Sequence, residues 1–181
     1  MVNIFDVIER EQLIQRRNEI SQQESIINYK KFVCFHLNGR EYGIDIEYVQ
    51  EIIEVGYIRK IIYMPQFLLG VLNLRGAIIA VIDLKQLFHL GQTDLKNEKA
   101  RLIISKFENK SLGFIVDSIA KIREIAPTDI QQAPATFNEI NSNYVLGMYR
   151  TPENNLLVML NYAEIFNCPE IKALSTEEQN G

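Results

Sequence analysis

Cys34 and His36 are the first residues of this chain whose types and spacing could support a reaction. They lie two positions apart in a run typical of a β-strand, which places both side chains on the same face. A thiol beside an imidazole is the arrangement of a nucleophile and its base. No third group that would orient the histidine is identifiable, and no anion-stabilising loop accompanies the pair. The pattern therefore favours two ordinary strand residues over a catalytic pair.

The other titratable residues form no recognisable metal or phosphate site. His89 ends a short predicted helix, where a partial positive charge is favourable. Glu47, Glu51 and Glu54 have helical spacing but no histidine partner, so a solvated face is favoured over a metal site. The glycine-rich loops that cradle nucleotide phosphates are missing from the sequence. The sequence thus predicts no catalytic residue, no metal and no cofactor, and a protein that is not an enzyme.

Arg75 is suited to a different chemistry, the recognition of an anion. It lies in a predicted tight turn at residues 73–76, between two apolar runs. A cation held there must point to solvent, to a binding partner or to an acid of its own chain. Its planar guanidinium matches the geometry of a carboxylate. From the residues alone, a solvated arginine is the simplest interpretation.

The composition is that of a folded, acidic protein. Of the 181 residues, 47% are hydrophobic and 23% are charged, which suits one medium domain or two small ones. The formal net charge of -4 argues against a general nucleic-acid binder, which needs a basic surface. Cys34 and Cys168 lack paired-ligand spacing and suit reduced thiols. We find no signal peptide and no membrane-spanning run, so we expect a cytoplasmic protein without direct membrane insertion.

Short strands and tight turns are the elements that must position any site. Asn38-Gly39 between two apolar runs predicts a hairpin, because both central residues of a type I′ turn need positive φ. Asp45 could cap a helical turn over residues 47–50. The nearly continuous apolar residues at 78–82 indicate a strand buried on both faces. The predicted strands are 32–37, 40–46, 67–74, 77–82, 102–107, 111–117, 119–125, 144–149 and 156–160.

Helices are expected to be few. Residues 1–29 lack Gly and Pro and predict an N-terminal helical extension, either solvated or docked on a partner. A short helix is expected at 84–90, ended by Gly91, and another at about 161–172. Residues 173–181 are expected to form a disordered tail. Many short strands without alternating helices predict barrels or a sandwich rather than a doubly wound sheet.

Several blocks of the sequence resemble the CheW family, and their spacing is similar to that of the family. The resemblance covers about residues 32–167. The blocks that carry it are Glu41-Tyr42-Gly43-Ile44-Asp45-Ile46, Val49-Gln50-Glu51-Ile52, Gly70-Val71-Leu72-Asn73-Leu74-Arg75-Gly76, Val81-Ile82-Asp83-Leu84, Gly113-Phe114-Ile115-Val116-Asp117-Ser118-Ile119 and Tyr144-Val145-Leu146-Gly147.

The resemblance implies a mainly β fold. It consists of two SH3-like five-stranded β-barrels around a shared hydrophobic core, with an N-terminal helix and short helices. The CheW-like domain would span residues 30–168, with barrel 1 at about 30–91, barrel 2 at about 92–160 and a short C-terminal helix at about 161–172.

The same resemblance implies a non-enzymatic adaptor in chemotaxis signal transduction. Its partners would be the regulatory domain of the histidine kinase CheA, the cytoplasmic tip of methyl-accepting chemoreceptors and further CheW copies, with no nucleic acid. It would be recruited to membrane-bound receptor arrays, with receptor helices in a groove between the barrels. Glu51 and Arg75 resemble a paired acid and base of the family. The residues carried over to receptor and kinase binding are Val49, Glu51, Gly70, Asn73, Arg75 and Gly76.

Two departures and three alternatives accompany this interpretation. Ile62 and Ala80 stand where the family often has proline. The alternatives are a CheW-like scaffold in a non-flagellar receptor–kinase pathway, a β-barrel that binds a small ligand or nucleic acid, and a hydrolase built on Cys34. The acidic charge counts against nucleic acid. A Cys34→Ala variant with intact function would exclude the hydrolase.

Overall fold

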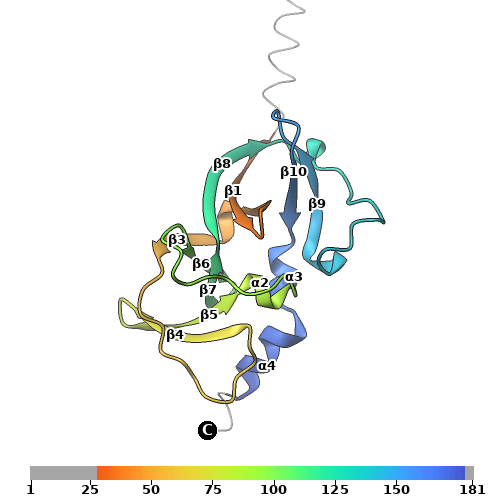
Figure 1. The fold of residues 1–181 in the computed structure, drawn as a ribbon. Coiled ribbons are helices and arrows are strands. Elements are labelled where there is room, and N and C mark those ends of the chain that lie inside the picture. Colours follow the sequence, from red (N-terminus) through yellow and green to blue (C-terminus); the bar gives the residue numbers. More distant parts are fainter. Residues whose placement is uncertain (1–27, 178–181) are drawn as a thin grey trace, which may run out of the picture.

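The computed structural model describes residues 28–177, which form a mainly β architecture with short helices (Figure 1). The predicted N-terminal helix at 1–29 lies outside the described residues, apart from residues 28 and 29, which are in neither a helix nor a strand. In chain order the elements are β1 Lys30–Leu37, β2 Arg40–Asp45, η1 Ile46–Tyr48, β3 Val49–Glu54, β4 Leu68–Leu74, β5 Ala77–Asp83, α2 Leu84–Leu87, β6 Arg101–Phe107, β7 Lys110–Val116, β8 Ser118–Ile125, η2 Pro127–Asp129, η3 Ser142–Tyr144, β9 Val145–Arg150, β10 Leu156–Leu160, α3 Tyr162–Phe166 and α4 Pro169–Glu177.

The strands of residues 28–177 form two five-stranded sheets. Sheet A has the strand order β8-β1-β2-β10-β9, and sheet B has the order β3-β6-β7-β5-β4. In Figure 1 sheet A occupies the upper half of the molecule and sheet B the lower half, with α2 and α3 near their junction. The expectation of a mainly β fold with two five-stranded units is confirmed.

Strands are exchanged between the two halves of the chain. β1–β5 and β6–β10 repeat one order of elements: a hairpin, a single strand and a second hairpin. Sheet A combines the first hairpin of the first repeat, β1–β2, with the three strands β8, β9 and β10 of the second repeat. Sheet B combines the first hairpin of the second repeat, β6–β7, with the three strands β3, β4 and β5 of the first repeat. The expected division into barrel 1 at 30–91 and barrel 2 at 92–160 is therefore wrong for the sheets. It separates the two repeats instead.

The connections after the first hairpins explain this exchange. β2 continues into β3 through the three-residue 3₁₀ helix η1, where the Glu47 amide donates to Asp45 Oδ1 at 3.1 Å. β7 continues into β8 through Asp117 alone. Connections this short leave no loop in which the chain could turn back onto its own hairpin. Each single strand therefore joins the opposite sheet.

One hydrophobic core joins the sheets and the helices, as expected. The ring of Phe114 on β7 lies 5.1 Å from that of Tyr162 and 5.5 Å from that of Phe166, both on α3. The Tyr162 hydroxyl shares a buried hydrogen bond of 2.9 Å with Ser105 of β6. Burial of each large apolar side chain contributes roughly 2–3 kcal/mol. Helix α3 is thus held on sheet B by apolar contact and one satisfied polar pair.

Three local predictions differ from the structure. Residues 49–54 form strand β3, with exposed and half-buried side chains in alternation, so the predicted helical turn at 47–50 is replaced by the shorter η1. Ile78 is 66% exposed, so β5 is not buried on both faces throughout. Helix α4 extends to Glu177, and the tail predicted at 173–181 is wrong for its first five residues; the remainder lies outside the described residues.

Candidate partner-binding site

A two-residue turn between β4 and β5 presents Arg75. Arg75 and Gly76 have φ values of +52° and +90°, and the flanking residues pair across the hairpin, which is the geometry of a type I′ turn. The Gly76 amide donates to Asn73 Oδ1 at 2.8 Å. The left-handed region disfavours a residue with a Cβ by about 1–2 kcal/mol. The turn therefore holds Arg75 in a conformation that arginine itself does not prefer.

Arg75 is paired with an acid of its own chain. Its Nη2 donates to Oε2 of Glu51 at 2.9 Å, and Glu51 lies on the edge strand β3. The Arg75 side chain is 79% exposed and that of Glu51 is 25% exposed. An ion pair this exposed contributes at most about 1 kcal/mol to stability. Its effect is to aim the guanidinium while leaving most of it open to solvent.

Gly70 and Val49, two further residues of the predicted site, lie within the fold and away from the Arg75 turn. A Cβ at Gly70, where φ is +141°, would lie 2.2 Å from the carbonyl oxygen of Arg59. That carbonyl accepts a hydrogen bond from the Val71 amide at 2.9 Å, which holds the loop 55–67 against β4. Val49 packs against the shared core. The structure thus joins four of the six residues at the turn and places Gly70 and Val49 elsewhere.

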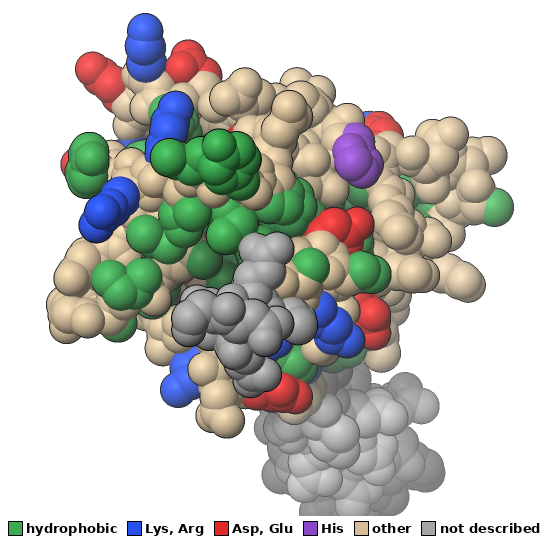
Figure 2. Space-filling view, turned by 90° about the horizontal axis from the view of Figure 1, so that it is seen from below, with side chains coloured by type: hydrophobic (Ala, Val, Ile, Leu, Met, Phe, Trp, Pro, Cys, Tyr) green, Lys and Arg blue, Asp and Glu red, His purple; other side chains and the backbone are tan. Residues whose placement is uncertain are grey.

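Apolar side chains are exposed on sheet B and on the loop that precedes β4. The loop 55–67 runs along the lower part of Figure 1. Figure 2, which views the molecule from below, shows hydrophobic side chains gathered in the middle of this face beside Lys and Arg side chains. Exposed apolar area with arginine at its edge is typical of a protein-binding surface. The exposed residues are Ile52, Tyr57, Ile61, Ile62, Tyr63 and Ile78.

Sheet A carries an ion pair at the corresponding place with the charges reversed. In the repeat, β8 corresponds to β3, and the turn between β9 and β10 corresponds to the turn that holds Arg75. Lys121 of β8 contacts Glu153 of that turn at 3.0 Å. The hydrogen bond from Lys121 lowers the pKa of Glu153 to about 2. Sequence reasoning missed this pair, because the repeat is visible in the order of strands and not in any shared motif.

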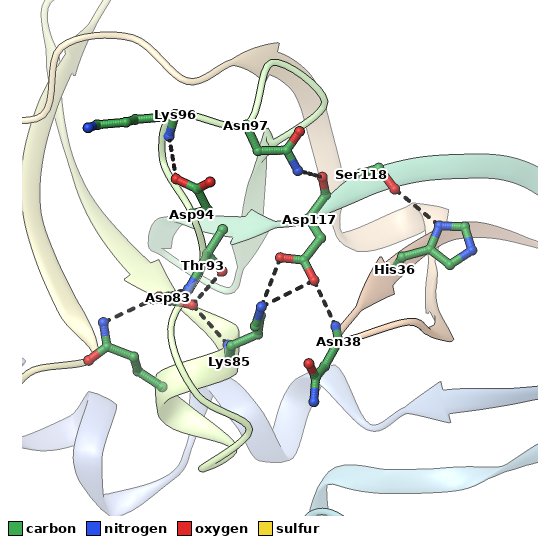
Figure 3. Close-up of polar contacts among 11 residues, drawn as sticks. His36, Asn38, Asp83, Lys85, Thr93, Asp94, Lys96, Asn97, Asp117 and Ser118 are labelled. Atoms are coloured by element: carbon green, nitrogen blue, oxygen red, sulfur yellow. Dashed lines mark hydrogen bonds and ion pairs between the residues drawn. The ribbon is translucent and has the colours of Figure 1, made fainter.

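Two aspartates of the sequence blocks hold helix α2 and the segment that follows it (Figure 3). Asp83 is fully buried and accepts hydrogen bonds from the amide and the hydroxyl of Thr93, both at 2.9 Å, and from the Lys85 amide at 3.0 Å. Asp117 pairs with the Lys85 ammonium at 3.2 Å and accepts from the Asn38 amide at 2.7 Å. Helix α2 is thereby tied to the β1–β2 turn of sheet A. Asp117 thus connects α2 to sheet A, whereas Asp83 holds α2 and the segment at Thr93 on sheet B.

The described part of the chain matches a known family over most of its length. The model of the CheW-like domain matches residues 31–170. The chain belongs to the CheW family. Two relatives bear the name Chemotaxis protein CheW. That of Treponema pallidum is 33% identical over 154 residues, covering 82% of this chain and 90% of the relative. That of Klebsiella aerogenes is 32% identical over 130 residues, covering 72% and 78%.

A solved CheW structure shares this fold. The crystal structure of the scaffolding protein TtCheW from Thermoanaerobacter tengcongensis superposes with a TM-score of 0.70 at 32% identity. The match covers 78% of this chain and 90% of that one. The expected family and its SH3-like fold class are confirmed. In the structure the motif blocks contain the Arg75 turn, the edge strand β3 and the two aspartates that hold helix α2.

Cys34 and His36 of this CheW fold do not form a nucleophile pair. The Cys34 thiol is buried and donates to the Phe32 carbonyl at 3.8 Å, whereas Nδ1 of His36 shares a hydrogen bond of 3.1 Å with Ser118 Oγ. Burial raises the pKa of Cys34 to about 12, which makes the thiol a poor nucleophile at neutral pH. His89 is exposed after α2. Across residues 28–177 we find no group of three potential metal ligands and no helix long and apolar enough to cross a bilayer.

The two cysteines should resist thiol reagents in the folded protein. Both are buried, and burial raises the pKa of both thiols. With Ellman's reagent at pH 8, we expect each to react at least about a hundredfold more slowly than in guanidinium-unfolded protein. Fast reaction of Cys34 in the folded protein would contradict its assignment to the core.

Proposed function

We propose that this protein is a non-enzymatic adaptor that links methyl-accepting chemoreceptors to the histidine kinase CheA. The observation that carries the proposal is the Glu51–Arg75 pair, in which an exposed guanidinium is aimed by an acid and held by a strained turn. Exposed apolar side chains accompany it on the same sheet. Membership of the CheW family and similarity to a protein described as a scaffold support assembly as the role, in place of catalysis.

In this proposal the protein acts in the cytoplasm, recruited to membrane-bound receptor arrays. The receptor tip would be helical, and a helix docks by placing apolar anchors in a groove, which in this proposal lies between the two sheets. The regulatory domain of CheA and further CheW copies would bind barrel surfaces. Signalling is then a coupling free energy transmitted through a rigid body. The residues proposed to form or support these contacts are Val49, Glu51, Gly70, Asn73, Arg75 and Gly76.

An Arg75→Asn variant separates recognition from stability. Asparagine tolerates the left-handed turn better than arginine, so the free energy of unfolding should stay within about 1 kcal/mol of the wild type or rise. The guanidinium is lost, and we expect affinity for the receptor cytoplasmic fragment or for CheA to fall about tenfold. Titration calorimetry with each partner, together with denaturant unfolding, measures both quantities.

Lys31→Ala is the matched control for this experiment. Lys31 forms an exposed ion pair with Glu124 at 3.4 Å on sheet A and has no proposed role. Its replacement should change neither affinity nor stability appreciably. Unchanged binding of both partners by the Arg75 variant would refute the role of Arg75. Weaker binding accompanied by a large loss of stability would assign Arg75 to the fold.

A further inference from the structure

The turn between β1 and β2 holds the one Asn-Gly pair of residues 28–177. Asn38 and Gly39 are both exposed, with φ values of +51° and +80°. They form the whole connection, because the neighbouring Leu37 and Arg40 already pair across the hairpin. A Cβ at Gly39 would meet nothing within 4 Å, so no neighbouring atom crowds this side of the turn. Asn38 therefore lies at an exposed tip, next to the least hindered amide nitrogen that a chain can offer.

The two groups that could react with each other are unbonded in the described part of the chain. The carboxamide of Asn38 makes no hydrogen bond there and points away from Asp117 in Figure 3. The amide of Gly39 makes none to those residues either. The turn is restrained instead through the backbone amide of Asn38, which donates to Oδ2 of Asp117 at 2.7 Å. A rotation of the Asn38 backbone, opposed by this bond, brings the carboxamide carbon and the Gly39 nitrogen together.

We propose that Asn38, a residue of a thermolabile type, is a site of spontaneous covalent modification that yields aspartate or isoaspartate. The Gly39 amide nitrogen gives up its proton and bonds to Cγ of Asn38, while the bond from Cγ to the carboxamide nitrogen breaks and ammonia leaves. Water then opens the resulting succinimide. Opening at Cγ gives aspartate, and opening at the backbone carbonyl carbon gives isoaspartate. The proposal is independent of the adaptor role, since neither residue belongs to the Arg75 site.

Isoaspartate at residue 38 alters the hairpin, because the backbone then runs through Cβ and gains a methylene group. The turn is lengthened, so the pairing of Leu37 with Arg40 and the bond to Asp117 no longer fit the same loop. Asp117 also pairs with Lys85 of α2 at 3.2 Å and is the link between this turn and the helix. The modification therefore loosens the contact between α2 and sheet A.

Peptide mapping by mass spectrometry of the folded full chain, incubated at pH 8, tests the proposal. The peptide with Asn38 should gain the mass difference between an amide and an acid, and should separate into aspartate and isoaspartate forms. Asn154 is the matched control, since it is also exposed, with a φ of +64°. Its Oδ1 accepts from Arg150 at 3.0 Å, and the next amide, of Asn155, donates to Thr151 Oγ1 at 3.2 Å. Because both bonds must break first, Asn154 should react at least about tenfold more slowly. Equal rates would overturn the proposal.

The melting temperature shows what the modification does to the fold. Protein rich in isoaspartate should melt about 2–4 °C lower than fresh protein. Asn38→Asp carries the new carboxylate on an unaltered, exposed backbone, so its melting temperature should stay within about 1 °C of the wild type. Asn38→Gly keeps a left-handed turn and cannot form the ring, while it retains Asn180-Gly181 outside the described residues. It should melt unchanged after the same incubation. No fall in isoaspartate-rich wild type, or an equal fall in Asn38→Gly, would refute the effect on the hairpin.

Discussion

Replacing Gly70 with alanine should lower the free energy of unfolding by about 3–5 kcal/mol. The added Cβ would lie 2.2 Å from the Arg59 carbonyl oxygen and 2.8 Å from its carbon, and both atoms belong to backbone that cannot rotate away. The φ of +141° adds a conformational cost for any residue with a Cβ. Relief requires the loop 55–67 to leave β4. Denaturant unfolding measures the loss, and faster hydrogen exchange at the Val71 amide would report the detached loop.

A Gly91→Ala variant separates the cost of the backbone conformation from the cost of the steric clash with Arg59. Gly91 has a φ of +108°, but a Cβ there would meet nothing within 4 Å. We expect a loss of only about 1–2 kcal/mol for this variant, from backbone conformation alone. If the two variants lost equal stability, the close approach of Arg59 would have no energetic weight. The role of Gly70 in holding the loop would then be refuted.

The glycine contact recurs in sheet A, where sequence reasoning did not look for it. A Cβ at Gly147 would lie 2.6 Å from the Gln131 carbonyl oxygen, and Gln131 exchanges backbone hydrogen bonds with Met148. In both sheets a glycine therefore allows a preceding loop to lie against an outer strand. The sequence shows each glycine, but the approaching backbone is distant in the chain. Such a contact can be predicted only with the topology in hand.

The hairpins could be predicted from the sequence, but the sheet that each hairpin joins could not. The Asn38-Gly39 turn predicts the β1–β2 hairpin, and Arg75-Gly76 between apolar runs predicts the β4–β5 hairpin, because each depends on a few neighbouring residues. The choice of partner for each hairpin depends on where β3 and β8 lead the chain. The expected barrel boundary between residues 91 and 92 ends a repeat whose strands lie in both sheets.

Strand β3 shows why part of the candidate site was ambiguous. Glu47, Glu51 and Glu54 fit a helical spacing. The sequence over 49–54 shows no clear alternation of apolar and polar residues, because each face of the strand carries an isoleucine and a glutamate. The contact of Glu51 with Arg75 was expected from the family resemblance alone. It joins an edge strand to a turn 24 positions away, so no local rule yields it.

The reversed ion pairs make the two sheets electrostatically distinct surfaces. Sheet B presents an acid on its edge strand and a cation on its turn, and sheet A presents the opposite. Like charges placed opposite one another disfavour a complex, so a partner complementary to one surface is mismatched to the other. The repeated fold therefore does not give two equivalent binding sites.

Asp83→Ala should lower the free energy of unfolding by about 3–5 kcal/mol. The fully buried carboxylate accepts from both donors of Thr93 and from the Lys85 amide at the start of α2. Its removal takes away the helix cap and leaves the Thr93 amide and hydroxyl buried without an acceptor. Each unsatisfied buried donor costs about 1–3 kcal/mol. The segment that follows α2 should loosen with it, visible as faster hydrogen exchange of the Thr93 amide.

An Asp45→Ala variant shows how much of the stability lost in Asp83→Ala comes from the buried donors and how much from the loss of a helix cap. Asp45 caps η1 through the Glu47 amide and pairs with Lys30. Its side chain is 14% exposed, but both donors belong to exposed residues that water can satisfy, so its loss should cost only about 1 kcal/mol. A cycle with Thr93→Val gives the second check. Without the threonine hydroxyl, removal of Asp83 leaves one fewer donor unpaired, and the double variant should be more stable than the sum of the single losses predicts. Additive losses, or an Asp83 variant no weaker than the Asp45 variant, would mean that the buried carboxylate does not hold this junction.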